Sequence, residues 1–195
     1  MENPTKFQEG EFKDLLNKIG VNEAFDKLDP SLKVPVESGA LYLRRLDLIG
    51  KGIESSDLAE LQGSEKAGEL EREAFQKQVK AEHDEVGRAY HKNNGEWFDE
   101  SIKELIEMAN SDNEAGVLND KVLYLPDHYI KRLDRAGEFY KKLASNLHEP
   151  ERVQMDQYLD EKRPKELDEM RKVFNNELGD ILSGIGKIHK DLKSK

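Results

Sequence analysis

The acidic pair Glu177 and Asp180, in the segment NNELGDILSGI, has a spacing that could support metal chemistry. Residues three apart project from the same side of an α-helix, so both carboxylates can face one ion. Carboxylate oxygens are ligands that Mg²⁺ accepts. The pair is therefore a candidate magnesium site. Acids at this spacing are also common in a chain with 37% charged residues, and the alternative is two solvated side chains beside an apolar seam.

The same segment resembles the ELGDxL segment of the all-α MazG-type nucleotide pyrophosphohydrolases. In that family an ExxE pair and an ExxD pair on neighbouring helices bind magnesium, and a nucleoside triphosphate is cut to its monophosphate. The resemblance covers about ten residues and implies that Glu177 and Asp180 would form the ExxD pair. The upstream ExxE pairs are Glu166 with Glu169, on the same helix, and Glu104 with Glu107, much farther back than the family spacing.

Other catalytic patterns are missing from the sequence. With no cysteine, the chain has no disulfide, thiolate metal site or cysteine nucleophile. Its five histidines are scattered, and none has the ExxH spacing of a di-iron bundle. No phosphate-binding loop, dinucleotide fingerprint, serine-hydrolase elbow or EF-hand pattern occurs. These observations favour a protein that is not an enzyme, with no cofactor; magnesium enters only under the pyrophosphohydrolase alternative.

The net charge of the chain limits the classes of molecule that it is expected to bind. The net charge is −10, and residues 57–114 hold sixteen acids against seven bases. An acidic chain is a poor general nucleic-acid binder, because phosphate contacts need clustered Lys and Arg. No apolar run approaches 18 residues, and the amino terminus has no secretory signal pattern. We therefore expect a cytoplasmic protein that binds neither nucleic acid nor membrane; export by a route that reads other signals stays open.

Two surface features favour a protein partner. The first is a run of cations between residues 131 and 142: Lys131, Arg132, Arg135, Lys141 and Lys142. They suit either an acidic partner or the chain's own acidic block. The second is Trp97 with Phe98 at the start of a helix, because tryptophan is enriched at interface hot spots. Packing of these two rings in the core is the alternative.

The carboxy-terminal stretch predicts the longest helix. Its apolar residues recur at steps of three and four, as on one helix face: Leu167, Met170, Phe174, Leu178, Ile181, Ile185, Ile188 and Leu192. Residues 127–147 keep a similar rhythm, and Glu149-Pro150 separates the two stretches. We expect them to pair as an antiparallel hairpin. Alternatively, the sustained stripe could form a coiled-coil homodimer through the carboxy-terminal helix.

In the earlier part of the chain, residues that break or cap helices predict where each helix ends and begins. Gly20 and Asp29-Pro30 should end two short helices, and residues 30–37, with Pro35, should form an extended connector. Gly50, Gly52 and Ser55-Ser56 should interrupt the next helix, with Ser56 or Asp57 capping a poorly amphipathic helix to about residue 93. We expect a helix from residue 97 to 109. Asp127, which directly follows Pro126, should then cap a new helix.

These patterns predict an all-α, elongated multi-helix bundle with a long C-terminal antiparallel hairpin. We expect one domain in three parts: residues 1–56 as an N-terminal hairpin and buried helix, residues 57–126 as a more exposed acidic segment, and residues 127–195 as the C-terminal hairpin. The function that fits is a non-catalytic helical interaction module, namely an adaptor, assembly factor or secreted effector.

Overall fold

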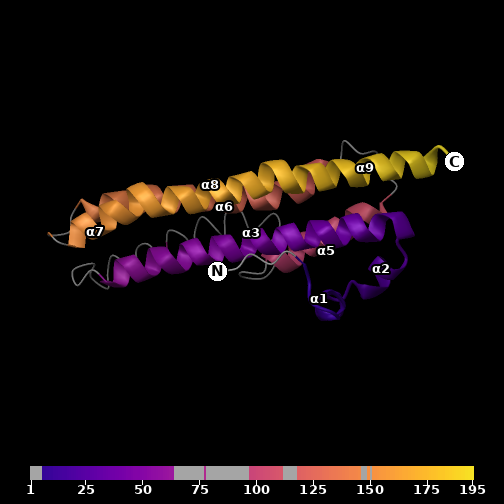
Figure 1. Cartoon of the computed structure of the whole chain (residues 1–195), viewed down its shortest axis with the longest axis horizontal. Coiled ribbons are helices and arrows are strands. Elements are labelled where there is room, and N and C mark those ends of the chain that lie inside the picture. Colours follow the sequence, from indigo (N-terminus) through magenta and orange to yellow (C-terminus); the bar gives the residue numbers. More distant parts are fainter. Residues whose placement is uncertain (1–5, 64–76, 78–96, 112–117, 146–148, 150) are drawn as a thin grey trace. The chain divides into compact units, whose positions relative to one another are not determined.

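The computed structural model describes residues 6–63, 77, 97–111, 118–145, 149 and 151–195. Their regular structure is entirely helical, which confirms the predicted all-α class (Figure 1). The helices are α1 Glu11–Ile19, α2 Asn22–Asp26, α3 Pro30–Gly63, α5 Trp97–Asn110, α6 Leu118–Ala144, α7 Glu151–Gln157, α8 Arg163–Lys172 and α9 Gly179–Lys193. Two π-helical segments, η1 Tyr158–Lys162 and η2 Val173–Leu178, join α7 to α8 and α8 to α9.

The chain divides into two units. Unit 1 comprises Met1–Leu48, Gly95–Asp127 and Lys172–Lys195, and unit 2 comprises Ile49–Asn94 and His128–Arg171. The boundaries fall inside α3 and α6 and near the end of α8. Each unit therefore gathers segments that are distant in sequence.

Unit 1 is built where α3, α5 and the end of the carboxy-terminal helix meet. A Cβ placed on Gly39 of α3 would lie 3.0 Å from Leu105 of α5 and 3.5 Å from Ile181 of α9, so these helices approach closely at the glycine. Helix α1 ends at Gly20 as expected, because this residue adopts φ 78°, a conformation that glycine tolerates best. Its Lys18 pairs with the buried Asp99 of α5 at 3.1 Å.

The apolar stripe of the carboxy-terminal helix is covered by the chain itself. Of its residues, Leu167, Met170, Leu178 and Ile185 are buried, as are Val173 and Leu182 beside them. Phe174, Ile181 and Ile188 are half-buried, and Leu192 is 36% exposed. This burial within a single chain supports the intramolecular alternative for the stripe.

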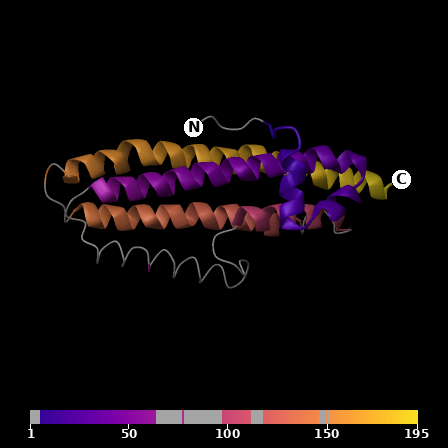
Figure 2. The same ribbon diagram turned by 90° about the horizontal axis from the view of Figure 1, so that it is seen from below.

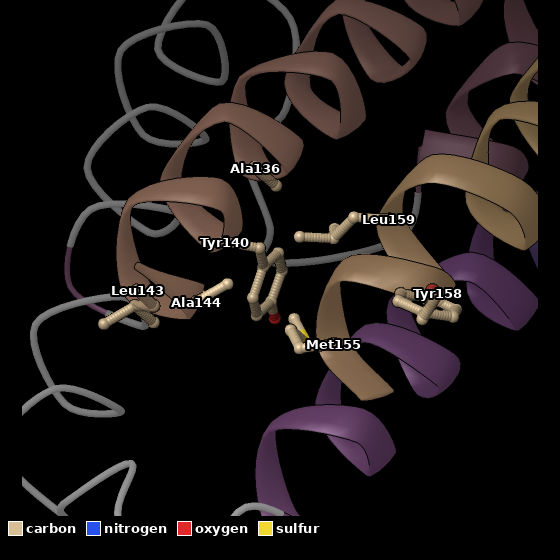
Figure 3. Packing of buried hydrophobic residues seen from close by; sticks show 7 residues of the cluster. All are labelled: Ala136, Tyr140, Leu143, Ala144, Met155, Tyr158 and Leu159. Atoms are coloured by element: carbon tan, nitrogen blue, oxygen red, sulfur yellow. The ribbon is translucent and has the colours of Figure 1, made fainter. Parts of the chain in front are cut away.

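Unit 2 contains the predicted antiparallel hairpin. In the view of Figure 2, α6 and the helix formed by α7, η1 and α8 run along the same direction, with α3 drawn between them. Their contact is a cluster of buried side chains in which the Tyr140 ring of α6 lies against Met155 and Leu159 (Figure 3). Burial of such apolar surface contributes roughly 25 cal/mol per Å², which is the main term holding the pair together. The hairpin prediction is confirmed.

The extended connector predicted for residues 30–37 is wrong. Helix α3 begins at Pro30, and Asp29 caps it by accepting a hydrogen bond of 2.9 Å from the backbone N–H of Ser31. Proline suits the first helical position, since its missing N–H has no partner there. Pro35 follows within the helix, where Leu32 and Val36 are buried on the side that faces the core.

The interruption predicted between Gly50 and Ser56 is also wrong, since α3 continues to Gly63. Gly50 is needed inside the helix, because a Cβ there would lie 2.1 Å from the ring of Tyr129. Asp57 does not cap a new helix but is buried. A glycine in a helix costs only about 1 kcal/mol, which tertiary packing outweighs. Most of the helix predicted for residues 57–93 lies outside the described residues.

A third correction concerns Pro126. We expected a helix to start after it at Asp127, whereas α6 runs through it from Leu118 to Ala144. Leu125 and Pro126 are both buried, so packing of this turn competes with the local preference of proline to end a helix.

Candidate functional site

The most distinctive polar site is a buried ion pair in unit 2, between Asp57 of α3 and Arg163 of α8. Arg163 donates from Nε to Oδ1 of Asp57 at 2.8 Å and from Nη2 to Oδ2 at 3.0 Å. The side chains are only 3% and 4% exposed. Two parallel N–H···O bonds fix the geometry of both groups more tightly than a single contact would.

Further groups complete this site. The Tyr158 hydroxyl of η1 donates to Oδ1 of Asp57 at 2.7 Å. Arg163 Nη2 also donates to the carbonyl oxygen of Leu133 in α6, at 2.5 Å. Gly137, one turn after Leu133, makes room for the guanidinium, because a Cβ there would lie 2.5 Å from Nη1. The site thus joins α3, α6 and the η1–α8 junction, and we call these five residues the buried network.

The π-helical turn η1 positions two members of the network. The backbone N–H of Arg163 bonds to the carbonyl of Tyr158, five residues earlier, instead of four. Pro164 follows directly and has no N–H to continue the normal ladder, so a widened turn at this place leaves fewer groups unsatisfied. Tyr158 and Leu159 are both buried from this turn, on different sides of the helix (Figure 3).

The electrostatics follow from burial and from the carboxylate. Burial and the charge of Asp57 raise the pKa of Tyr158 and of Tyr140 well above the ordinary tyrosine value. Burial lowers the pKa of Arg163, but the hydrogen bond and charge of Asp57 more than offset this, so the pKa is raised overall. The network therefore holds charged Arg163 and Asp57 beside neutral tyrosines.

The arrangement suits a structural role better than catalysis. The charged atoms of Asp57 and Arg163 are nearly closed to solvent, and each bonds to other groups of the network. A buried pair of this kind contributes little net stability against apolar replacements, but losing one partner leaves an uncompensated charge. The sequence did hold a signal: Arg163 interrupts the apolar row of Leu159 and Leu167. That interruption does not identify Asp57 as the partner of Arg163.

The predicted cations on α6 divide into two groups. Lys131, Arg135, Lys141 and Lys142 are exposed. Arg132 turns inward, where it forms an ion pair with Glu54 of α3, and its side chain is 17% exposed. Its guanidinium also lies over the Tyr129 ring, 4.7 Å from the centroid. Burial lowers the pKa of Arg132 to about 10, still far above neutral pH.

The acidic pair of the magnesium hypothesis lies in unit 1. Glu177, in η2, accepts a hydrogen bond from Nη1 of Arg45 at 2.8 Å, and Asp180 is exposed at the start of α9. Within the described residues there is no group of three acidic or histidine side chains that could hold a metal. Of the upstream acids, Glu107 is exposed on α5 and Glu166 belongs to α8. An arginine on Glu177 supports the reading of this acid as an ion-pair partner.

Trp97 and Phe98 differ in their surroundings. Trp97 is 5% exposed and belongs to the core of unit 1, whereas Phe98 is half-buried. Trp97 O accepts a hydrogen bond from Oγ of Ser101 at 2.5 Å, which ties the first turn of α5 together. The burial of Trp97 supports the core-packing alternative for this residue.

None of the helices that the structure describes combines the length and apolar character needed to cross a membrane. A comparison of the chain with protein-family models, with curated proteins and with solved structures finds no match.

Proposed function

We propose that the chain is a non-catalytic helical interaction module, as in an adaptor, an assembly factor or a secreted effector. The observation that carries this is the α6 stripe, defined as the exposed cations Lys131, Arg135, Lys141 and Lys142. On a helix with 3.6 residues per turn, Lys131, Arg135 and Lys142 fall within roughly 40° of one another. Clustered cations on a chain with net charge −10 favour an acidic protein surface as the partner.

The composition of the stripe also indicates how a partner would be recognised. Between residues 131 and 142 the acids of α6 are Asp134, which pairs with Arg171, and the exposed Glu138, against five cations, so the local charge is positive. Exposed charges act mainly on association rate and specificity, and salt screens them over about 10 Å at 0.1 M. Binding should therefore weaken as salt is added.

Charge reversal tests the proposal. The variant Lys131→Glu/Arg135→Glu/Lys142→Glu reverses the stripe without touching a buried residue. A matched control reverses three exposed lysines of α9: Lys187, Lys190 and Lys193. Each protein is immobilised and used to capture partners from a lysate at several salt concentrations. We expect the wild-type chain and the control to retain the same stoichiometric partner, and the stripe variant to lose it.

Two results would contradict the proposal. One is capture of the partner by the stripe variant as efficient as by the wild-type chain. The other is a partner lost equally from the α9 control, because the surface would then lie elsewhere. Sedimentation of the free chain tests the separate expectation of a homodimer through the carboxy-terminal helix.

A thermal-shift scan separates this proposal from the magnesium-dependent pyrophosphohydrolase. We expect no stabilisation by Mg²⁺ with nucleoside triphosphates. A ligand that binds the folded state at 100 times its Kd would add about 2.7 kcal/mol to the free energy of unfolding. Such a stabilisation, lost in Glu177→Gln, would replace the interaction module with the hydrolase.

A further inference from the structure

We propose that the buried network fixes the register of α3 against the α6/α7–α8 hairpin in unit 2. Three departures from the apolar pattern meet in it. On α3 the buried row Gly50, Ile53, Asp57 contains one charge, and on α8 the row Leu159, Arg163, Leu167 contains another. On α6 the glycine of the row Leu133, Gly137, Tyr140 stands at the same level. The three exceptions are therefore one feature of the packing.

Apart from Gly50, which makes room for the Tyr129 ring, the apolar rows do not distinguish one register from the next. Buried residues recur every three or four positions on each helix, so a slide of one turn, 5.4 Å, places apolar side chains against apolar side chains again. Packing of this kind is tolerant of rearrangement when volume and pattern are kept. Another determinant is needed to make one register unique.

Asp57 and Arg163 supply that determinant. They are the only charged residues that are buried among the described residues of unit 2. In the observed register the Asp57 carboxylate accepts three hydrogen bonds, and the Arg163 guanidinium donates three, two to Asp57 and one to the carbonyl of Leu133. A slide of one turn would leave both charges buried against apolar side chains, and that penalty excludes the alternative. A single polar residue fixes register in coiled coils for the same reason.

Replacement of both charges tests the proposal. In Asp57→Leu/Arg163→Met the apolar rows become continuous, and the variant should fold, because such replacements are often neutral or stabilising. Register is read from the distance between two spin labels. The chain has no cysteine, so in Ser55→Cys/Val153→Cys these two exposed positions are the two sites that take a label. Gln154, next to Val153, donates a hydrogen bond to Glu60, which is five residues after Ser55 on α3. The two labels are therefore displaced along the helix axes, and a slide of α3 changes the distance between them.

We expect one distance in the labelled chain that keeps Asp57 and Arg163, and a new distance, alone or beside the first, in the apolar variant. The new distance should differ by up to about 5 Å, one helical turn. The control is Glu54→Gln/Arg132→Gln, which removes an ion pair between α3 and α6 that water reaches. It should leave the single distance unchanged.

Three outcomes would overturn the proposal. The first is an apolar variant that keeps the single original distance. The second is an apolar variant that fails to fold, because the network would then be needed for stability and not for register. The third is a control that also shows a new distance, since any ion pair between α3 and the hairpin would then set the register.

Discussion

Gly137→Ala offers a sharp test of the buried network, because it adds one methyl group and removes no contact. The new Cβ would lie 2.5 Å from Nη1 of Arg163, well inside van der Waals contact. The guanidinium has little freedom to move away. Its Nε and Nη2 are held by Asp57 at 2.8 and 3.0 Å, and Nη2 is also held by the carbonyl of Leu133.

The magnitude follows from two opposing terms. Alanine in place of a helical glycine stabilises by about 1 kcal/mol. Separating a buried ion pair costs roughly 3–5 kcal/mol, since it leaves buried charges without partners. We therefore expect Gly137→Ala to lower the free energy of unfolding by about 2–4 kcal/mol. For a chain of this size that corresponds to a fall in Tm of roughly 5–15 °C.

Urea denaturation followed by circular dichroism measures the change. Gly184→Ala is the control, because a Cβ on this helical glycine meets nothing within 4 Å and should stabilise by up to about 1 kcal/mol. A second comparison places Gly137→Ala in an Arg163→Met background, where most of the penalty should vanish. A Gly137→Ala protein as stable as the wild-type chain would refute the claim that the guanidinium is fixed in place.

Three further predictions concern the same unit. Tyr158→Phe should lower the free energy of unfolding by about 1.5–3 kcal/mol in urea denaturation, because it removes a hydrogen bond to charged Asp57; no loss would mean that the bond contributes nothing. Because the pKa values of Tyr158 and Tyr140 are raised in the folded chain, their contribution is fully present below pH about 10 and lost as pH rises further, by up to about 1.4 kcal/mol per pH unit for each tyrosine. Denaturation between pH 9 and 12 should show a shallower decline in Tyr158→Phe than in the wild-type chain, and equal slopes would contradict this cause. Gly50→Ala should lower the free energy of unfolding by about 1–3 kcal/mol, because its Cβ would lie 2.1 Å from the buried ring of Tyr129, and an unchanged urea midpoint would show that the ring can shift freely.

The candidate site was only partly accessible from the sequence. Lys131 and Arg135 were predicted as surface cations and are exposed, whereas Arg132, one residue away from Lys131, turns towards Glu54. Neighbouring helical residues point in directions about 100° apart, so Lys131 and Arg132 lie on different faces of α6. Which of them turns inward depends on where another helix lies.

The sequence determined the helical class, the stripe on the carboxy-terminal helix and the end of α1. These features follow from periodicity and from terminators such as Gly20, which act within a few residues. Tertiary structure decided the continuity of α3 through Gly50 and of α6 through Pro126. There, burial against neighbouring helices outweighs local preferences of about 1–3 kcal/mol.

Tertiary structure alone decided that Asp57 would meet Arg163. The two residues are 106 positions apart, and each by itself resembles an ordinary charge on a helix. A charge in an apolar row signals that a partner exists, but the identity of the partner depends on how the helices align in space. Asp57 and Arg163 meet only once the helices that carry them pack together, because no local interaction links α3 to α8.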